Sequence, residues 1–306
     1  MTVAAGAGPG ALLVIGDVVT DVVARHHAPL ARGTDTAAAI RILPGGAGAN
    51  VACWAARWGC PDVRILARVG QDEAGWHDAR LRAAGVRPLL VPDAEAPTAT
   101  VIALVDASAE RTFLTDSGAV LRLSPADWSP TLLDGVGHLH LSGYLLFADI
   151  SRQLALLAME SARELGIPVS VDPASAGFIS ALGVDRMLSA LSGADVLVPN
   201  ADEARLLTGL PDPSDAAAKL SLHVPLTVVT LCADGALVAE SGTVTARVPP
   251  VPADAVDSTG AGDAFTGAFL AARLAGADPA TAAAEGCRAG AEAVTLIGGR
   301  PDRLPT

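Results

Sequence analysis

"AVDSTGAGDAF", residues 255–265, places Gly260, Ala261 and Gly262 between two aspartates at the start of an apolar, helix-like run. The first N–H groups of a helix have no intrahelical partner and carry the positive end of the helix dipole. Glycines allow an anion to approach those N–H groups closely. We therefore interpret residues 260–263 as a candidate cradle for a transferring phosphate. Asp263 is then the general base that takes a proton from the attacking hydroxyl group.

The same stretch supports two other interpretations. The simpler one is a glycine-rich turn capped by Ser258 or Thr259, in which Asp263 only complements the helix dipole. A dinucleotide fingerprint fits less well, because "GAGDAF" lacks the third glycine and no clear strand directly precedes it. Taken alone, the stretch leaves the capped turn and the phosphate cradle about equally favoured.

The lysine count narrows the ways in which this chain could bind phosphate. Lys219 is the only lysine among 306 residues, and no glycine run ends in lysine as a P-loop requires. The lysine on a strand that protein kinases use is also missing. Phosphate would therefore be bound by backbone N–H groups, arginine and a metal ion.

Charge and apolar content limit the partners. A formal net charge of −12 argues against nucleic acid or an anionic membrane as a partner. The most apolar runs carry aspartates and are too short to span a bilayer. "MTVAAGAGPG" (1–10) lacks the basic and long apolar regions of a signal peptide, and the four cysteines form no CxxC pair. We expect a cytoplasmic protein with reduced thiols.

Strand-like and helix-like segments alternate along most of the chain. The predicted strands span 12–19, 63–70, 138–143, 168–173, 195–200 and 226–231, and the predicted helices span 50–59, 72–85, 151–166, 201–209, 262–276 and 281–294. This alternation predicts one α/β domain over residues 1–306, with a mainly parallel sheet flanked by helices on both faces. Two insertions without helices, 22–43 and roughly 86–116, predict a small β-sheet lid.

A second glycine-rich loop, "PGGAGANVA" (44–52), also leads into a helix. Its glycines, Gly45 and Gly46, could let a sugar-sized substrate touch the backbone, and Asn50 could bond a hydroxyl group or simply cap the helix. "GDVVTD" (16–21) places Asp17 and Asp21 after the first strand. Both are either acceptors for substrate hydroxyl groups or ordinary turn acids.

"PNADEA" (199–204) contains Asn200 and Glu203. The N-x-x-E spacing is a capping box, which is the favoured interpretation of this motif alone. The functional alternative is an amide and a carboxylate that hold Mg²⁺ through water. His138 and His140 share one face of a strand, but the sequence supplies no third zinc ligand.

Together these motifs resemble the ribokinase-like (PfkB) family of carbohydrate and nucleoside kinases. "GGAGANVACWAARWG" (45–59) with "GQDEAG" (70–75) is similar to the N-terminal signature of the family, and "DSTGAGDAFTGAF" (257–269) to its highly specific C-terminal signature. The resemblance spans nearly the whole chain. It implies a three-layer α/β sandwich with a β-sheet lid and ATP-dependent phosphoryl transfer to a hydroxymethyl group.

The resemblance also implies a role for each matching position. For catalysis these are Asp263 as base, with the N–H groups of Gly260, Ala261 and Gly262 stabilising the γ-phosphoryl group. For the acceptor they are Asp17, Asp21, Gly45, Gly46, Asn50 and, from the lid, Arg111. For the nucleotide they are Asn200, Thr230, Gly235, Thr259 and the 295–299 segment with Gly298. For metals they are Glu203, which would hold Mg²⁺ through water, and Asp257, beside a potassium site in members that use one.

The sequence departs from the family pattern at three positions that bear on the substrates. Val19 and Ala47 stand where ribose-specific relatives carry polar residues, and Cys232 stands in place of a glycine of the nucleotide loop. We rank sugars and sugar acids first as acceptors, then a nucleoside such as pseudouridine, with phosphorylated sugars less favoured. A catalytically silent sugar-binding protein on the same fold is the alternative from a different class. By analogy with the family, the lid could also form a homodimer.

Overall fold

The computed structural model describes residues 10–107 and 111–301. Within these ranges, the main sheet has nine strands in the order β13-β12-β11-β10-β9-β8-β1-β4-β5. The parallel strands are β1 (Ala11–Ile15), β4 (Val63–Gly70), β5 (Val86–Asp93), β8 (Val136–Ser142), β9 (Val169–Asp172), β10 (Val196–Leu197) and β11 (Leu226–Thr230). Two antiparallel strands, β12 (Ala236–Glu240) and β13 (Thr243–Val248), complete one edge.

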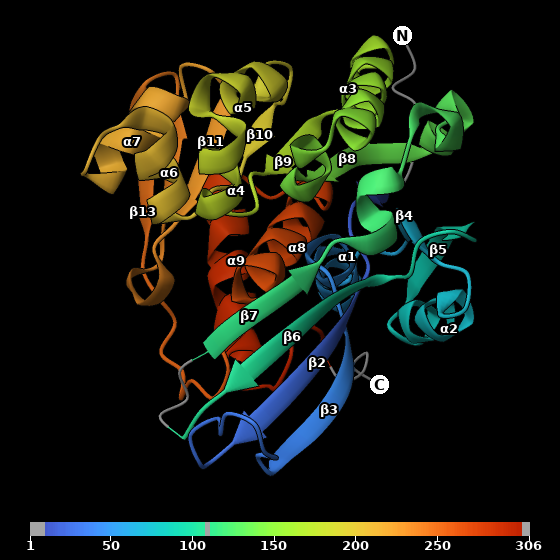
Figure 1. Ribbon diagram of the computed structural model, residues 1–306. Helices are drawn as coiled ribbons and strands as arrows, with labels where there is room; N and C mark the ends of the chain where they lie inside the picture. The colour runs from blue at the N-terminus through green and yellow to red at the C-terminus, as the bar shows by residue number, and fades with distance from the viewer. Residues whose placement is uncertain (1–9, 108–110, 302–306) are drawn as a thin grey trace, which may run out of the picture.

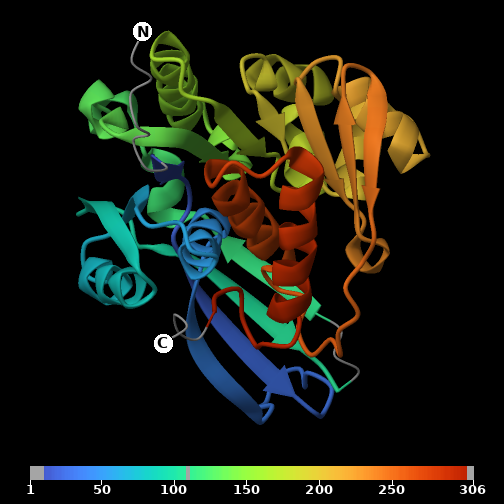
Figure 2. The same ribbon diagram turned by 180° about the vertical axis from the view of Figure 1, so that it is seen from behind.

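Helices cover both faces of this sheet (Figures 1 and 2). One face carries α1 (Ala47–Arg57), α2 (Ala74–Ala83), α8 (Ala261–Leu274) and α9 (Pro279–Ala293), and the other carries α3 (Asp149–Glu164), α4 (Ala176–Leu182), α5 (Val184–Leu191), α6 (Ala201–Thr208) and α7 (Pro213–Leu220). Alternate side chains of β1 enter the two cores: Leu12 packs with α1 and α8, and Leu13 with α3. None of the helices in the described ranges combines the length and apolarity needed to cross a membrane.

The lid is a separate four-stranded sheet in the order β3-β2-β6-β7. Its strands are β2 (Val19–His26), β3 (Ala38–Gly45), β6 (Ala99–Val105) and β7 (Arg111–Asp116). It differs from the predicted lid at two places. The apolar run 12–19 breaks at Gly16 and Asp17, so β2 begins at Val19, and residues 86–93 form β5, the edge of the main sheet.

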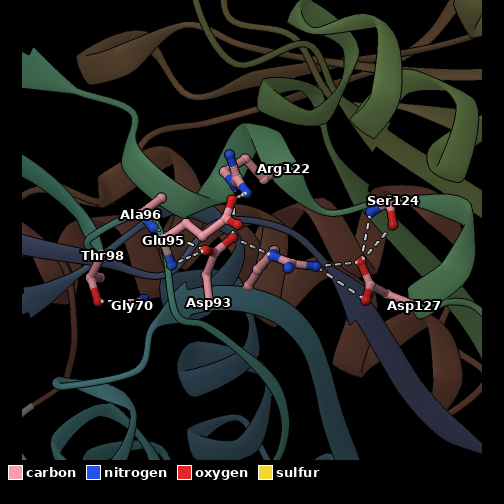
Figure 3. Close-up of polar contacts among 9 residues, drawn as sticks. Gly70, Asp93, Glu95, Ala96, Thr98, Arg122, Ser124 and Asp127 are labelled. Atoms are coloured by element: carbon pink, nitrogen blue, oxygen red, sulfur yellow. Dashed lines mark hydrogen bonds and ion pairs between the residues drawn. The ribbon is translucent and has the colours of Figure 1, made fainter.

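After β5 ends at Asp93, the chain passes through residues 94–98 into the lid strands β6 and β7 and returns through a 3₁₀ turn, Gly118–Arg122. Asp93 accepts the N–H groups of Glu95 and Ala96 and pairs with Nε of both Arg68 and Arg122, each at 2.8 Å (Figure 3). These N–H groups and guanidinium groups hold the pKa of Asp93 well below its usual range. The network therefore ties the outgoing and returning chain segments to one carboxylate at the base of the lid.

Candidate active site

A cavity of about 490 Å³ lies between the carboxyl ends of the parallel strands and the inner face of the lid. Open parallel sheets bind ligands at this edge. Most residues singled out in the sequence line this cavity: Asp17, Asp21, Gly46, Asn50, Asn200, Glu203, Thr230, Thr259, Gly260, Gly262 and Asp263. The two glycine-rich loops, more than 200 residues apart in the chain, thus meet at one site.

The candidate phosphate-cradle loop, residues 260–263, leads into α8. Its two glycines occupy different structural environments. Gly260 is the N-cap with φ 75°, and a Cβ there would lie 2.5 Å from Cα of Gly299. Gly262 faces the cavity, and a Cβ there would meet no atom within 4 Å. The N–H group of Ala261 donates to the carbonyl of Ser258 at 3.3 Å, and Ala261 does not line the cavity. The N–H groups of Gly262 and Asp263 are therefore better placed to donate hydrogen bonds to an anion.

Asp263 lies in the first turn of α8 beside the second glycine loop. Its Oδ2 accepts a 2.7 Å hydrogen bond from Nδ2 of Asn50 in α1. Burial raises the pKa of Asp263 well above its usual range, and the nearby carboxylates of Asp172, Asp17 and Asp21 act in the same direction. The bond from Asn50 opposes that rise. A raised pKa is what a general base working near neutral pH requires.

Asp17 has a structural role that the sequence left open. Its carboxylate accepts the N–H groups of Ala47, at 2.7 Å, and Gly48, at 3.0 Å, and the hydroxyl group of Ser142 at 2.8 Å. Asp17 therefore stabilises the start of α1 and positions the loop that precedes Asn50.

Asp21 projects from the lid strand β2 over the same loop. A Cβ at Gly45 would lie only 2.1 Å from Oδ2 of Asp21, so glycine is required for this close approach. Burial raises the pKa of Asp21 to about 6, although the positive charge of Arg300 opposes the shift. Asp21 thus brings a carboxylate from the lid to the cavity wall, where it can accept a hydrogen bond from a hydroxyl group of a substrate.

Asn200 and Glu203 form the capping box that their spacing predicts. The side-chain oxygen of Asn200 accepts the N–H group of Glu203 at 2.9 Å, and Oε2 of Glu203 accepts the N–H group of Asn200 at 2.9 Å. Thr230 pairs with Asn200 through a parallel bridge at the ends of β11 and β10. Asn200, Glu203 and Thr230 also line the cavity, so the structure is compatible both with a capping box and with a role in binding Mg²⁺ and nucleotide.

The sequence interpretation missed Asp172, at the end of β9. Asp172 and Glu203 both line the cavity, and burial raises the pKa of each carboxyl group, with repulsion from Asp17 adding to the rise for Asp172 and repulsion from Asp172 adding to it for Glu203. The signal was available, since a carboxylate at the carboxyl end of a parallel strand marks this edge of the sheet.

The fit for Mg²⁺ follows from these carboxylates. No cluster of three or more metal-ligating side chains occurs in the described part of the chain. Mg²⁺ in phosphate-transfer sites commonly keeps several waters and binds one or two carboxylates together with substrate phosphates. Glu203, with Asp172 nearby, suits that arrangement, and the raised pKa values mark a place where added positive charge is favoured.

Several predicted site residues do not line the cavity: Gly45, Ala261, Gly235, Gly298 and Asp257. Asp257 is buried and accepts the N–H groups of Thr259 at 2.7 Å and Gly298 at 3.1 Å, so it joins the cradle loop to the tail. Cys232 has φ 53°, a conformation that glycine adopts without strain. Arg111 begins β7, and its side chain lies outside the described part of the structure.

Apolar side chains form another part of the wall that the sequence did not reveal. Phe147 and Phe178 stack with ring centroids 5.0 Å apart, and Tyr144 packs edge-on against Phe178 at 5.7 Å. The lid adds Val101 and Phe113 opposite. These rings come from segments that carry no motif, which is why their position in the site appears only in the fold.

Comparison with known proteins gives the same family along the whole chain. The model of the "pfkB family carbohydrate kinase" family matches residues 10–306. A fructokinase from Klebsiella pneumoniae is 32% identical over 276 residues, covering 86% of this chain and 84% of the relative.

Two solved structures have a similar fold. Aminoimidazole riboside kinase from Salmonella enterica, complexed with aminoimidazole riboside and an ATP analogue, aligns with TM-score 0.78 and 28% identity over 96% of each chain. An E. coli protein described as a ribokinase II, in complex with ATP and Mg²⁺, aligns with TM-score 0.82 and 26% identity over 95% of this chain and 94% of that one. The predicted ribokinase-like fold, with a mostly parallel sheet, flanking helices and a small separate sheet, is confirmed.

Proposed function

The chain belongs to the pfkB family of carbohydrate kinases, phosphotransferases that act on hydroxyl groups, and on this premise we propose that it phosphorylates the hydroxymethyl group of a small neutral sugar. Kinases of this family use ATP with Mg²⁺. The observation that carries the proposal is Asp263, which faces the cavity from the N-terminus of α8 and is bonded by Asn50.

In the proposed reaction Asp263 takes the proton of the acceptor hydroxyl group as the hydroxyl oxygen attacks the γ-phosphorus of ATP, and the bond from that phosphorus to the β-phosphate oxygen breaks to release ADP. The N–H groups of Gly262 and Asp263, with the positive end of the α8 dipole, stabilise the negative charge on the transferring group. Glu203 would hold Mg²⁺ through water, and Thr230 and Thr259 would contact the nucleotide. When bound, Mg²⁺ supplies positive charge to the phosphates.

The charges of the wall favour a neutral acceptor. Among the described side chains that line the cavity, five carry a carboxyl group: Asp17, Asp21, Asp172, Glu203 and Asp263. No lysine or arginine is among these described lining residues. Among these described lining residues, a sugar acid or a phosphorylated sugar would meet five carboxyl groups and no lysine or arginine. Hydroxyl groups, in contrast, can donate to Asp21 and accept from Asn50.

A coupled assay of ADP release tests the proposal with a panel of ketoses, aldoses, sugar acids and nucleosides. Turnover with a neutral sugar is the expected result. Turnover only with sugar acids would contradict the neutral acceptor. If the whole panel gives no ADP above the background of Asp263→Asn, while calorimetry detects sugar binding, the protein is a silent sugar binder.

A nucleoside is the second candidate, and the aromatic wall favours it. Tyr144, Phe147 and Phe178, with Phe113 from the lid, offer planar apolar surface of the kind on which a base can stack. In the assay panel, a nucleoside with kcat/KM above that of every free sugar would favour this candidate.

A monovalent cation near Asp257 and a lid-mediated homodimer are further parts of the proposal. Turnover in KCl compared with tetramethylammonium chloride tests the cation. For the dimer, the strand register places apolar side chains in rows on the lid face opposite the cavity: Val22, Ile40, Ile42, Ile102, Leu104 and Leu114. Ile40 and Ile42 are 64% and 63% exposed, which suits contact with the same face of a second copy.

A further inference from the structure

Arg300 lies behind the active site, immediately after the glycine that supports the phosphate-cradle loop. It is only 8% exposed and does not line the cavity. Its Nε donates to Oδ1 of Asn50 at 3.3 Å, and Nη2 donates to the carbonyl of Gly45. Within the described residues Nη1 has no hydrogen-bond partner. Both partners of this buried cation are thus neutral oxygens, an expensive arrangement if its only role were stability.

The tail does not depend on Arg300 for its attachment. The indole Nε1 of Trp54 donates to the carbonyl of Gly299 at 2.9 Å, and the N–H group of Gly298 donates to Asp257 at 3.1 Å. These bonds hold the two residues before Arg300 in place from two different elements. The position of the guanidinium group therefore calls for another explanation.

Carboxylates provide that explanation. Burial lowers the pKa of Arg300, whereas the negative charges of Asp21, Asp17 and Asp263 favour its charged form, and Arg300 in turn opposes the rise in the pKa of Asp21. The ionisable and polar groups that interact with Asp263 come from separate elements: Asn50 (α1), Asp17 (after β1), Asp21 (β2), Tyr144 (after β8), Asp172 (β9) and Arg300 (tail). Arg300 is the cation of this group, and Asn50 is its hydrogen-bond donor.

The orientation of the side-chain amide of Asn50 depends on whether Arg300 contacts its oxygen or its nitrogen. A guanidinium group has donors and no acceptor, so it must bond the oxygen of the amide. The NH₂ group then faces Asp263 and donates to it at 2.7 Å. A rotated amide would instead present its oxygen to Asp263, which favours the protonated acid.

From these contacts we infer that Arg300 is a positioning residue for phosphoryl transfer: it fixes the amide of Asn50 and, with its charge, keeps Asp263 able to accept a proton. The inference rests on the proposed role of Asp263. It assigns to a residue outside both glycine-rich motifs the task of maintaining the contact between them.

The first test does not need turnover. The carboxyl resonance of Asp263 is titrated by ¹³C NMR in the full-length protein, with Asp263→Asn for assignment. In Arg300→Met the titration midpoint should rise by about one pH unit, a tenfold change in proton affinity. Arg300→Lys, which keeps the charge but not the fork of donors, should give a smaller rise. Trp54→Phe, which loses a tail anchor, should leave the midpoint unchanged.

The second test measures kcat with a saturating acceptor. Arg300→Met should lower kcat about tenfold at pH 7 and recover toward wild type at higher pH. In an Asn50→Ala background the same substitution should cost about threefold or less, because the amide through which it acts is gone.

An unchanged Asp263 midpoint in both Arg300 variants, or equal pH-independent losses of kcat in the two backgrounds, would overturn the inference. Failure of the proposed function has a different signature. The wild-type protein would then give no turnover with any acceptor, while the NMR midpoint would still respond to Arg300.

Discussion

Nδ2 of Asn50 donates to Oδ2 of Asp263 at 2.7 Å across a sequence separation of 213 residues. The bond joins the start of α1 to the start of α8, and both helix N-termini open on the same cavity. In the proposed mechanism, the first helix brings an amide that can contact an acceptor, and the second brings the base and the N–H groups for phosphate. The contact would then link acceptor binding to the chemical step.

Asp263→Asn should lower kcat by roughly 10²–10⁴-fold, because the amide cannot take the proton of the acceptor hydroxyl group. ATP affinity should change little, since the N–H groups of the loop remain. Steady-state kinetics and calorimetry with an ATP analogue measure the two effects. A variant with full turnover would disprove the base assignment.

The two glycines of the cradle should respond differently to alanine. Gly260→Ala forces a side chain into a φ of 75° and against Gly299, so its melting temperature should fall by several degrees. Gly262→Ala has space and should melt near wild type, yet its methyl group projects where the phosphate would bind. We expect its kcat to fall about tenfold or more. Calorimetric melting and kinetics distinguish these outcomes, and the reverse pattern would refute the assignment.

Binding of Mg·ATP should release protons near pH 7. The pKa values of Glu203 and Asp172 are raised, so the pair is partly protonated there, and added positive charge favours the ionised forms. Apparent affinity should consequently weaken as pH falls from 8 to 6. Calorimetry in two buffers of different ionisation enthalpy measures the release.

Glu203→Gln should reduce this proton release, and Asp202→Asn, on the exposed side of the same helix turn, serves as the control. Identical heats in the two buffers for the wild-type protein would exclude a titrating carboxylate at the metal site.

Asp93→Asn should loosen the base of the lid and raise the KM for the acceptor several-fold, with a smaller effect on kcat. The depressed pKa of Asp93 means that its ion pairs persist above about pH 4 and are lost only as pH falls further. The KM effect should therefore be constant across the assay range. Asp62→Asn is a matched control, because Asp62 pairs with arginines at the opposite ends of β4 and β5.

A charge on the outer face of the lid should disrupt the proposed dimer. Ile40→Asp with Ile42→Asp would place two carboxylates in the apolar rows, and sedimentation should detect monomers where the wild type sediments as a dimer. Leu222→Asp, at a distant site that is 70% exposed, controls for the added charge. A wild-type protein that is monomeric at every concentration would contradict the proposal.

Local sequence was enough to predict the alternating fold, and the resemblance of the two glycine-rich loops to family signatures assigned both of them to one active site. Each loop contains turn-forming residues and leads into a helix, and the apolar face of each helix is of the kind that packs against a parallel sheet. The assignment of one strand was wrong. Residues 86–93 were predicted in the lid because no helix follows them, but their pairing with β4 makes them the edge of the main sheet.

Side chains that depend on long-range packing could not be predicted. Phe147 and Phe178 meet only because α4 packs against the turn after β8, and no short pattern records that contact. Arg300 is a single cation between glycine and proline, without any periodic signal. Its place beside Asn50 becomes evident only once the tail is seen to pass beneath the cradle loop.

The stacking of Gly299 under Gly260 has a consequence for biosynthesis. A nascent chain that still lacks residues 298–300 can pair most of its strands, yet nothing supports its phosphate loop from below or fixes the amide of Asn50. We expect such ribosome-bound or truncated chains to be catalytically incompetent until residues 298–300 are in place.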